Sequence, residues 1–133
     1  MTGTYLGNKK VDMTHGPSGV SIITDAPKDN HGEGSSFSPT DLFTVSLGSC
    51  IITTMAIYAE RNGIALSGST FELEKIMFPD PRRVGAIPLK VRMPAELSKE
   101  NRETLERVAH TCPVHKSVHP DMQIDIQFVY DIA

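Results

Sequence analysis

The sequence contains few cysteines and few aromatic residues, and its positive and negative charges nearly balance. It holds two cysteines and no tryptophan in 133 residues, and a chain of that length can bury a core without disulfide staples. Small disulfide-scaffold proteins are therefore excluded. Its 13 basic and 16 acidic residues leave a net charge of -3. Because neither sign forms a long run, we expect no nucleic-acid partner.

Long apolar runs are also missing. The first residues are polar, and no stretch reaches the roughly 18 consecutive apolar residues of a transmembrane helix. We therefore expect no membrane partner and a cytoplasmic location. Thiols stay reduced in the cytoplasm, so a bond between Cys50 and Cys112, the two cysteines, would be transient and functional rather than structural.

Repeats, low-complexity segments and linkers are absent as well, so we expect one domain over residues 1–133. Turn formers over residues 28–36 predict an exposed loop. Pro88 predicts that its strand lies at a sheet edge or is bulged there. Alternating apolar residues predict short strands near residues 11–13, 20–22, 71–73, 87–93 and 122–130.

Two helices are expected between these strands, which makes the fold class α+β. The first begins at Pro39 after a capping serine and ends at the Asn62-Gly63 pair. Its middle is apolar on nearly every side, so it needs cover from a further helix or subunit, and we infer a homodimer with this helix near its centre. The second helix begins after Ser98. Pro113 cannot continue it, so Cys112 should lie at a kink or cap a new short turn.

Two segments around the cysteines resemble the paired signatures of the OsmC/Ohr family, named for osmotically induced and organic hydroperoxide resistance proteins. They are SFSPTDLFTVSLGSC, which ends at Cys50, and AHTCPVHKSV, which contains Cys112. The resemblance implies antiparallel sheets wrapped around two central helices in an intertwined homodimer. It also implies a thiol-dependent peroxidase that reduces organic hydroperoxides. Cys50 would attack the peroxide and become a sulfenic acid, Cys112 would resolve it, and an external dithiol would restore both.

The supporting residues of that family's site differ here. Where its peroxidases carry a glutamate after the helix-starting Asn-Pro, this chain has Thr40, with Asp41 one place later and about 100° further around the helix. No arginine precedes Arg61 in the place of the arginine that the family takes from its N-terminal strands. The basic residues that could substitute for it are Lys9, Lys10, His15, Arg82 and Arg83. The candidate supporting residues are therefore Thr40, Asp41, Arg82 and Arg83.

A peroxidatic cysteine reacts as the thiolate, and an ordinary thiol is only about 3% ionised at pH 7. Cys50 lies about 16 Å from the start of its predicted helix, beyond the first turn over which the helix dipole acts. A basic neighbour is therefore required. Cys112 is placed differently, because a residue just before Pro113 can lie at a helical N-terminus where backbone amides stabilise an anion.

Three other interpretations stay open. Both cysteines fall on otherwise apolar helix faces, so they could be ordinary core residues. The chain could instead be a small-molecule binding protein with an apolar cleft and little or no peroxidase activity. The residues His110, Cys112, His115 and His119 are of zinc-ligating types, although positions two apart diverge on a helix. We expect no metal and no cofactor, and either a peroxide or an apolar ligand as the small-molecule partner.

Overall fold

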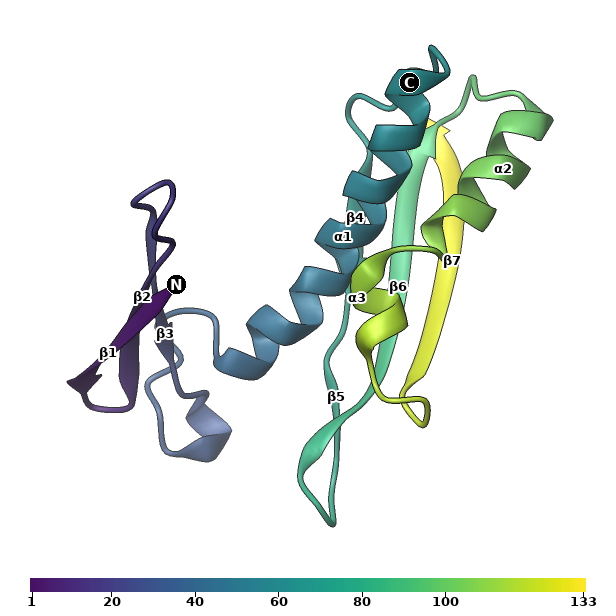
Figure 1. The fold of residues 1–133 in the computed structure, drawn as a ribbon. Coiled ribbons are helices and arrows are strands. Elements are labelled where there is room, and N and C mark those ends of the chain that lie inside the picture. The colour runs from purple at the N-terminus through teal and green to yellow at the C-terminus, as the bar shows by residue number, and fades with distance from the viewer. The chain divides into compact units, whose positions relative to one another are not determined.

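The structure, a computed structural model that describes residues 1–133, divides into two compact units, Met1–Phe43 and Thr44–Ala133. Strands and helices are mixed along the chain, which confirms the α+β prediction. The elements in chain order are β1 (Thr2–Gly7), β2 (Lys10–Thr14), β3 (Ser21–Asp25), η1 (Lys28–Asn30), α1 (Pro39–Arg61), β4 (Thr70–Leu73), β5 (Ile76–Phe78), β6 (Arg83–Pro94), α2 (Lys99–Ala109), α3 (Pro113–Ser117) and β7 (Gln123–Ile132) (Figure 1).

The N-terminal unit contains an antiparallel sheet in the order β1-β2-β3. Asn8 and Lys9 join β1 to β2 with φ values of 50° and 61°, the backbone of a tight hairpin turn that matches the twist of the strands. The neighbours Ile22 and Ile23 point to opposite faces and are 48% and 46% exposed. A small sheet that buries neither face fully needs cover from outside itself.

The loop after β3 is anchored by Asp25, which is fully buried. Its carboxylate accepts hydrogen bonds from the Ser35 hydroxyl at 2.6 Å and the Ser35 N–H at 2.9 Å. These bonds, helped by the nearby ammonium of Lys10, hold the pKa of Asp25 below its usual value. Gly32 crosses Ala26 so closely that a Cβ would lie 1.7 Å from the Ala26 carbonyl oxygen. The predicted loop is therefore held by specific contacts.

Helix α1 begins and ends where the sequence predicts. The Ser38 hydroxyl accepts the N–H of Asp41 at 3.1 Å, and the Asp41 carboxylate accepts the N–H of Ser38 at 2.9 Å. This reciprocal pair is a capping box. At the other end Gly63 has a φ of 66°, and the Ile64 N–H donates to the Ala59 carbonyl at 2.9 Å. The left-handed glycine closes the last turn.

The sheet of the C-terminal unit is built on β6. Strands β4 and β5 pair with β6 antiparallel, and β7 pairs with it parallel. Pro88 lies within this central strand and pairs with Asp125 without a register shift, so the prediction of an edge strand or a bulge there was wrong. Pro88 has no N–H to donate, but β4 ends opposite it. The Glu74 N–H still donates to the Pro88 carbonyl at 3.1 Å, and beyond Glu74 the segment after β4 needs no donor from Pro88. The proline therefore costs little pairing.

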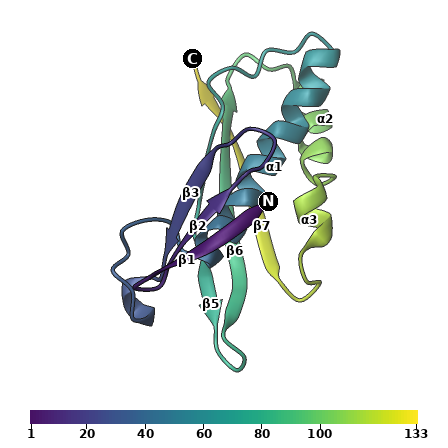
Figure 2. The ribbon, with the colours of Figure 1, turned by 60° about the vertical axis from the view of Figure 1, so that its left-hand side comes forward.

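Helices α1 and α2 cover one face of this sheet (Figures 1 and 2). By length and composition alone α1 could cross a membrane, a test that core helices of soluble proteins also pass. Its buried residues instead join the core of the C-terminal unit. The fully or almost fully buried side chains of that core are Leu47, Ile51, Met55, Ala59, Ile87, Leu89, Val91, Met93, Leu105, Ala109 and Cys112.

Gly48 sets how closely α1 approaches β4. A Cβ on this residue would lie 2.5 Å from two ring carbons of Phe71, so an added methyl group has no room. In an open helix Gly→Ala stabilises by about 1 kcal/mol. Here we expect Gly48→Ala to lower the free energy of unfolding by about 1–3 kcal/mol, because overpacking forces the ring to move.

Chemical denaturation of Gly48→Ala, Phe71→Leu and the double variant tests this contact. The double variant should lose less stability than the two single losses added together, since leucine frees the space that the methyl group needs. Strictly additive losses would show that the two residues do not compete for that space.

Candidate functional site

The structure brings Cys50 and Cys112 together in the C-terminal unit. Cys50 lies in the middle of α1 and is half-buried, while Cys112 is fully buried at 0% exposure. Both are free thiols, and they are neighbours: Cys112 belongs to the core cluster against which Cys50 packs, and Cys50 raises the pKa of Cys112. The pair singled out from the sequence is therefore one site, with one sulfur at the surface of the core and the other inside it.

Cys112 is held in place by the break between α2 and α3. It is the N-cap of α3, as predicted, with φ -60° and ψ 138°. Pro113 explains this position, because proline cannot extend α2 but suits the first residue of a new helix. The N–H of His115 donates to the Cys112 sulfur at 3.2 Å. The sulfur thus accepts a hydrogen bond that the helix start would otherwise leave unmade.

Burial raises the pKa of the Cys112 thiol above its usual value. The backbone amide of His115 acts in the opposite direction, and the neighbouring Cys50 raises the pKa further. Because burial dominates, Cys112 keeps its proton near neutral pH. A protonated Cys112 can donate its S–H toward the sulfur of Cys50. The pair is therefore asymmetric: Cys50 meets solvent-borne reagents, and Cys112 stands behind it as a thiol.

Cys50 has a second contact along its own helix. The Thr54 hydroxyl oxygen lies 4.0 Å from the Cys50 sulfur. No basic side chain of the C-terminal unit forms an ion pair or hydrogen bond with Cys50. The sequence prediction did not include Thr54. Its spacing of four residues from Cys50 is the signal that could have found it, because residues four apart meet on a helix.

Three of the predicted supporting residues, Thr40, Asp41 and Arg83, have local contacts of their own. Asp41 caps α1 through Ser38, and the Thr40 hydroxyl lies 3.1 Å from the Ser38 hydroxyl. Arg83 donates to the carbonyls of Pro79 and Pro81 at 2.8 and 2.9 Å. Those bonds stabilise the turn between β5 and β6. Roles of Thr40, Asp41, Arg82 and Arg83 at the thiols stay predictions from the sequence.

The basic residues of the N-terminal unit also have local roles. Lys9 forms the hairpin turn, and the Lys10 ammonium lies 2.7 Å from the Glu33 carboxylate. That hydrogen bond raises the pKa of Lys10. The His15 ring nitrogen Nδ1 lies 2.6 Å from the Ser18 hydroxyl. The charge of Lys10 is thus already paired within its own unit.

The histidines near Cys112 form no metal centre in the chain. The rings of His110 and His115 meet edge to face with centroids 5.7 Å apart. Desolvation, together with the charges of His110 and Lys116, lowers the pKa of His115. No three His, Cys, Asp or Glu side chains gather closely enough to hold a metal ion. The side chains of His110, Cys112, His115 and His119 therefore do not form a set of four metal ligands.

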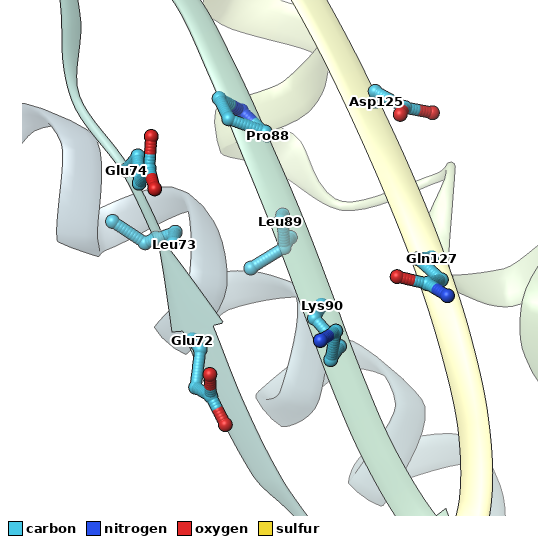
Figure 3. Close-up of a pocket in the computed structure, with 8 residues that line it drawn as sticks. All are labelled: Glu72, Leu73, Glu74, Pro88, Leu89, Lys90, Asp125 and Gln127. Carbon is cyan, nitrogen blue, oxygen red and sulfur yellow. The ribbon is translucent and has the colours of Figure 1, made fainter.

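A separate hollow of about 420 Å³ lies on the C-terminal sheet. Figure 3 shows its lining residues, which come from β4, β6 and β7 and include Glu74, the residue that follows β4. Pro88 and Lys90 alternate along β6 with the buried Ile87, Leu89 and Val91, so this is the face turned away from the core. Neither cysteine lines the hollow. It belongs to the solvated surface and not to the thiol site.

Comparison with known proteins identifies the family. The family model described as OsmC-like protein matches residues 32–127, a range that contains both cysteines. The chain belongs to the OsmC-like protein family. The family predicted from the two cysteine segments is confirmed. None of the curated proteins compared with the chain matches it.

Solved structures share this fold over nearly the whole chain. One from Psychrobacter arcticus 273-4, named as a candidate osmotic stress induced and detoxification response protein, is 40% identical with a TM-score of 0.92, over 96% of this chain and 93% of that one. The organic hydroperoxide resistance protein OsmC of Legionella pneumophila is 17% identical with a TM-score of 0.74, over 97% of both chains. The organic hydroperoxide resistance protein OhrB of Bacillus subtilis is 18% identical with a TM-score of 0.68, over 96% of this chain and 98% of that one.

Proposed function

We propose that this OsmC-like protein is a thiol-dependent peroxidase that reduces organic hydroperoxides. The observation that carries the proposal is that the half-buried Cys50 packs against the core cluster that contains the buried Cys112, and that the two thiols influence each other electrostatically. A single buried cysteine is an ordinary core residue, but two neighbouring free thiols form a dithiol that oxidation can close. Proteins of the same fold from Legionella pneumophila and Bacillus subtilis are named organic hydroperoxide resistance proteins. Those names support the substrate class.

The reaction begins with Cys50 as the thiolate. Its sulfur attacks the terminal oxygen of the hydroperoxide, the O–O bond breaks, and the alkoxide leaves and takes a proton to become an alcohol. Cys50 is then a sulfenic acid. The sulfur of Cys112 attacks the Cys50 sulfur, and the hydroxyl group leaves with the Cys112 proton as water. An external dithiol reduces the resulting disulfide and is itself oxidised to a disulfide.

The asymmetry of the site suits this order of steps. Burial keeps Cys112 protonated and away from the peroxide, so the first oxidation falls on Cys50. When Cys112 gives up its proton, the N–H of His115 already points at its sulfur and stabilises the charge that develops there. The resolving thiol is therefore in place before the sulfenic acid forms.

A stoichiometric titration with cumene hydroperoxide tests the proposal. One equivalent should consume both thiols of the wild-type chain, read with a thiol reagent and a peroxide assay. Cys50→Ser should consume peroxide no faster than buffer. Cys112→Ser should still react and stop at a sulfenic acid that dimedone traps. The proposal is wrong if neither substitution changes thiol loss or peroxide consumption.

We propose further that the protein works as a homodimer in the cytoplasm. Ser49, Thr53 and Ile57 are exposed along one side of α1, and Ile57 is 49% exposed. A second copy laid along this stripe would supply the cover that an apolar helix needs. It would also be a source of the basic neighbour that Cys50 lacks within the C-terminal unit.

Sedimentation measures the oligomeric state. The wild-type protein should sediment at twice the chain mass of 14.5 kDa. Ile57→Glu should shift it toward the monomer, because a buried unpaired charge opposes association. Glu100→Lys, on the exposed start of α2, is the control and should leave the dimer intact. A wild-type monomer at micromolar concentration would contradict the dimer.

Binding of an apolar small molecule is a second candidate function. A hollow of about 420 Å³ on the N-terminal sheet favours it. Apolar ligand sites are typically hollows of this size. Ligand recovered from the purified protein, with negligible turnover of several hydroperoxides, would favour this function over the peroxidase. The residues that line the hollow are Met1, Thr2, Gly3, Val11, Met13, Thr14, His15, Val20 and Ile22.

A further inference from the structure

Thr54 is the one hydroxyl group in contact with the Cys50 sulfur, at a distance of 4.0 Å. The two residues are four apart on α1, so the helix itself places both side chains on the same side, one turn from each other. Both are half-buried. The contact therefore depends only on the helix and would persist in any assembly of the chain.

The hydroxyl of Thr54 has no other hydrogen-bond partner in the chain. A threonine inside a helix commonly donates to a backbone carbonyl of the preceding turn. Thr54 makes no such bond, and its one hydrogen-bond partner is the Cys50 sulfur. Its neighbours Ile52, Met55 and Ala56 are apolar. Valine has the same shape and would fill this position equally well, so the packing alone does not call for a hydroxyl group.

We propose that the Thr54 hydroxyl donates a hydrogen bond to the thiolate of Cys50 and acts as a positioning residue of the thiol site. Neutral sulfur is a weak acceptor, and hydrogen bonds to ionised groups are stronger and shorter. The bond therefore favours the ionised form. It acts eleven residues after the start of α1, where the helix dipole no longer reaches. Its part in peroxide reduction rests on the proposed function, whereas its effect on the thiolate does not.

Three substitutions separate the hydroxyl from the methyl group and from the helix. Thr54→Val removes the hydroxyl and keeps the shape. Thr54→Ser keeps the hydroxyl and removes the methyl group. Thr104→Val makes the same change at a half-buried position of α2, outside the thiol site and the proposed dimer stripe, and is the matched control. Circular dichroism checks folding, and Thr54→Ala replaces Thr54→Val if the latter does not fold.

The readout is the rate at which iodoacetamide alkylates Cys50, followed by mass spectrometry. In Thr54→Val we expect a fall of about fivefold at pH 7, the size of one weak hydrogen bond to a charged group. Thr54→Ser and Thr104→Val should stay near the wild-type rate. The difference in rate between Thr54→Val and the wild type should narrow at about pH 10, because thiols ionise there without a stabilising hydrogen bond. If the substitution instead blocked the access of iodoacetamide to Cys50, the lower rate would persist at every pH.

A Thr54→Val rate equal to that of the wild type would overturn the proposal. So would a Thr54→Ser rate as low as that of Thr54→Val, because the effect would then belong to the methyl group. The same proteins are also treated with cumene hydroperoxide. Slower alkylation of Thr54→Val, with no oxidation of any protein including the wild type, would support the role of Thr54 and refute the proposed peroxidase.

Discussion

The contact between the Cys50 and Cys112 thiols is the interaction on which the rest of the account depends. It exists because two separate pieces of packing meet at one place. Leu47, Ile51 and Met55 seat α1 on the C-terminal sheet, and Leu105 and Ala109 seat α2 beside it. The chain then breaks at Pro113 and leaves Cys112 as a cap facing α1. The core therefore makes neighbours of two thiols that are distant in the sequence.

Burial sets the order in which the two cysteines react. It excludes solvent from Cys112 and raises its pKa, so that the thiol stays protonated while Cys50 faces outward. A sulfenic acid left alone is open to further, irreversible oxidation. A resolving thiol already in contact competes with that reaction. The same packing that stabilises the fold thus supplies the feature that distinguishes a redox pair from two core cysteines.

Local signals in the sequence predicted the helices and the position of Cys112, because capping and proline geometry depend only on neighbouring residues. Ser38, Gly63 and Pro113 act within one turn, and each prediction is confirmed. Strand β1 was missed because its glycines weaken the alternating pattern. The prediction from Pro88 was wrong because the effect of its missing N–H depends on where the neighbouring strand ends. No local pattern shows which basic group approaches Cys50, since that depends on chain segments far away in the sequence.

Peptide mapping of the peroxide-treated protein, without reduction, tests whether Cys112 resolves an oxidised Cys50. We expect one disulfide, between Cys50 and Cys112 of the same chain, and no other oxidised cysteine. Sulfinic acid at Cys50 with a free thiol at Cys112 would contradict it, because the second sulfur would then not reach the first. A disulfide joining two chains would contradict it as well, since the contact in the structure lies within a single chain.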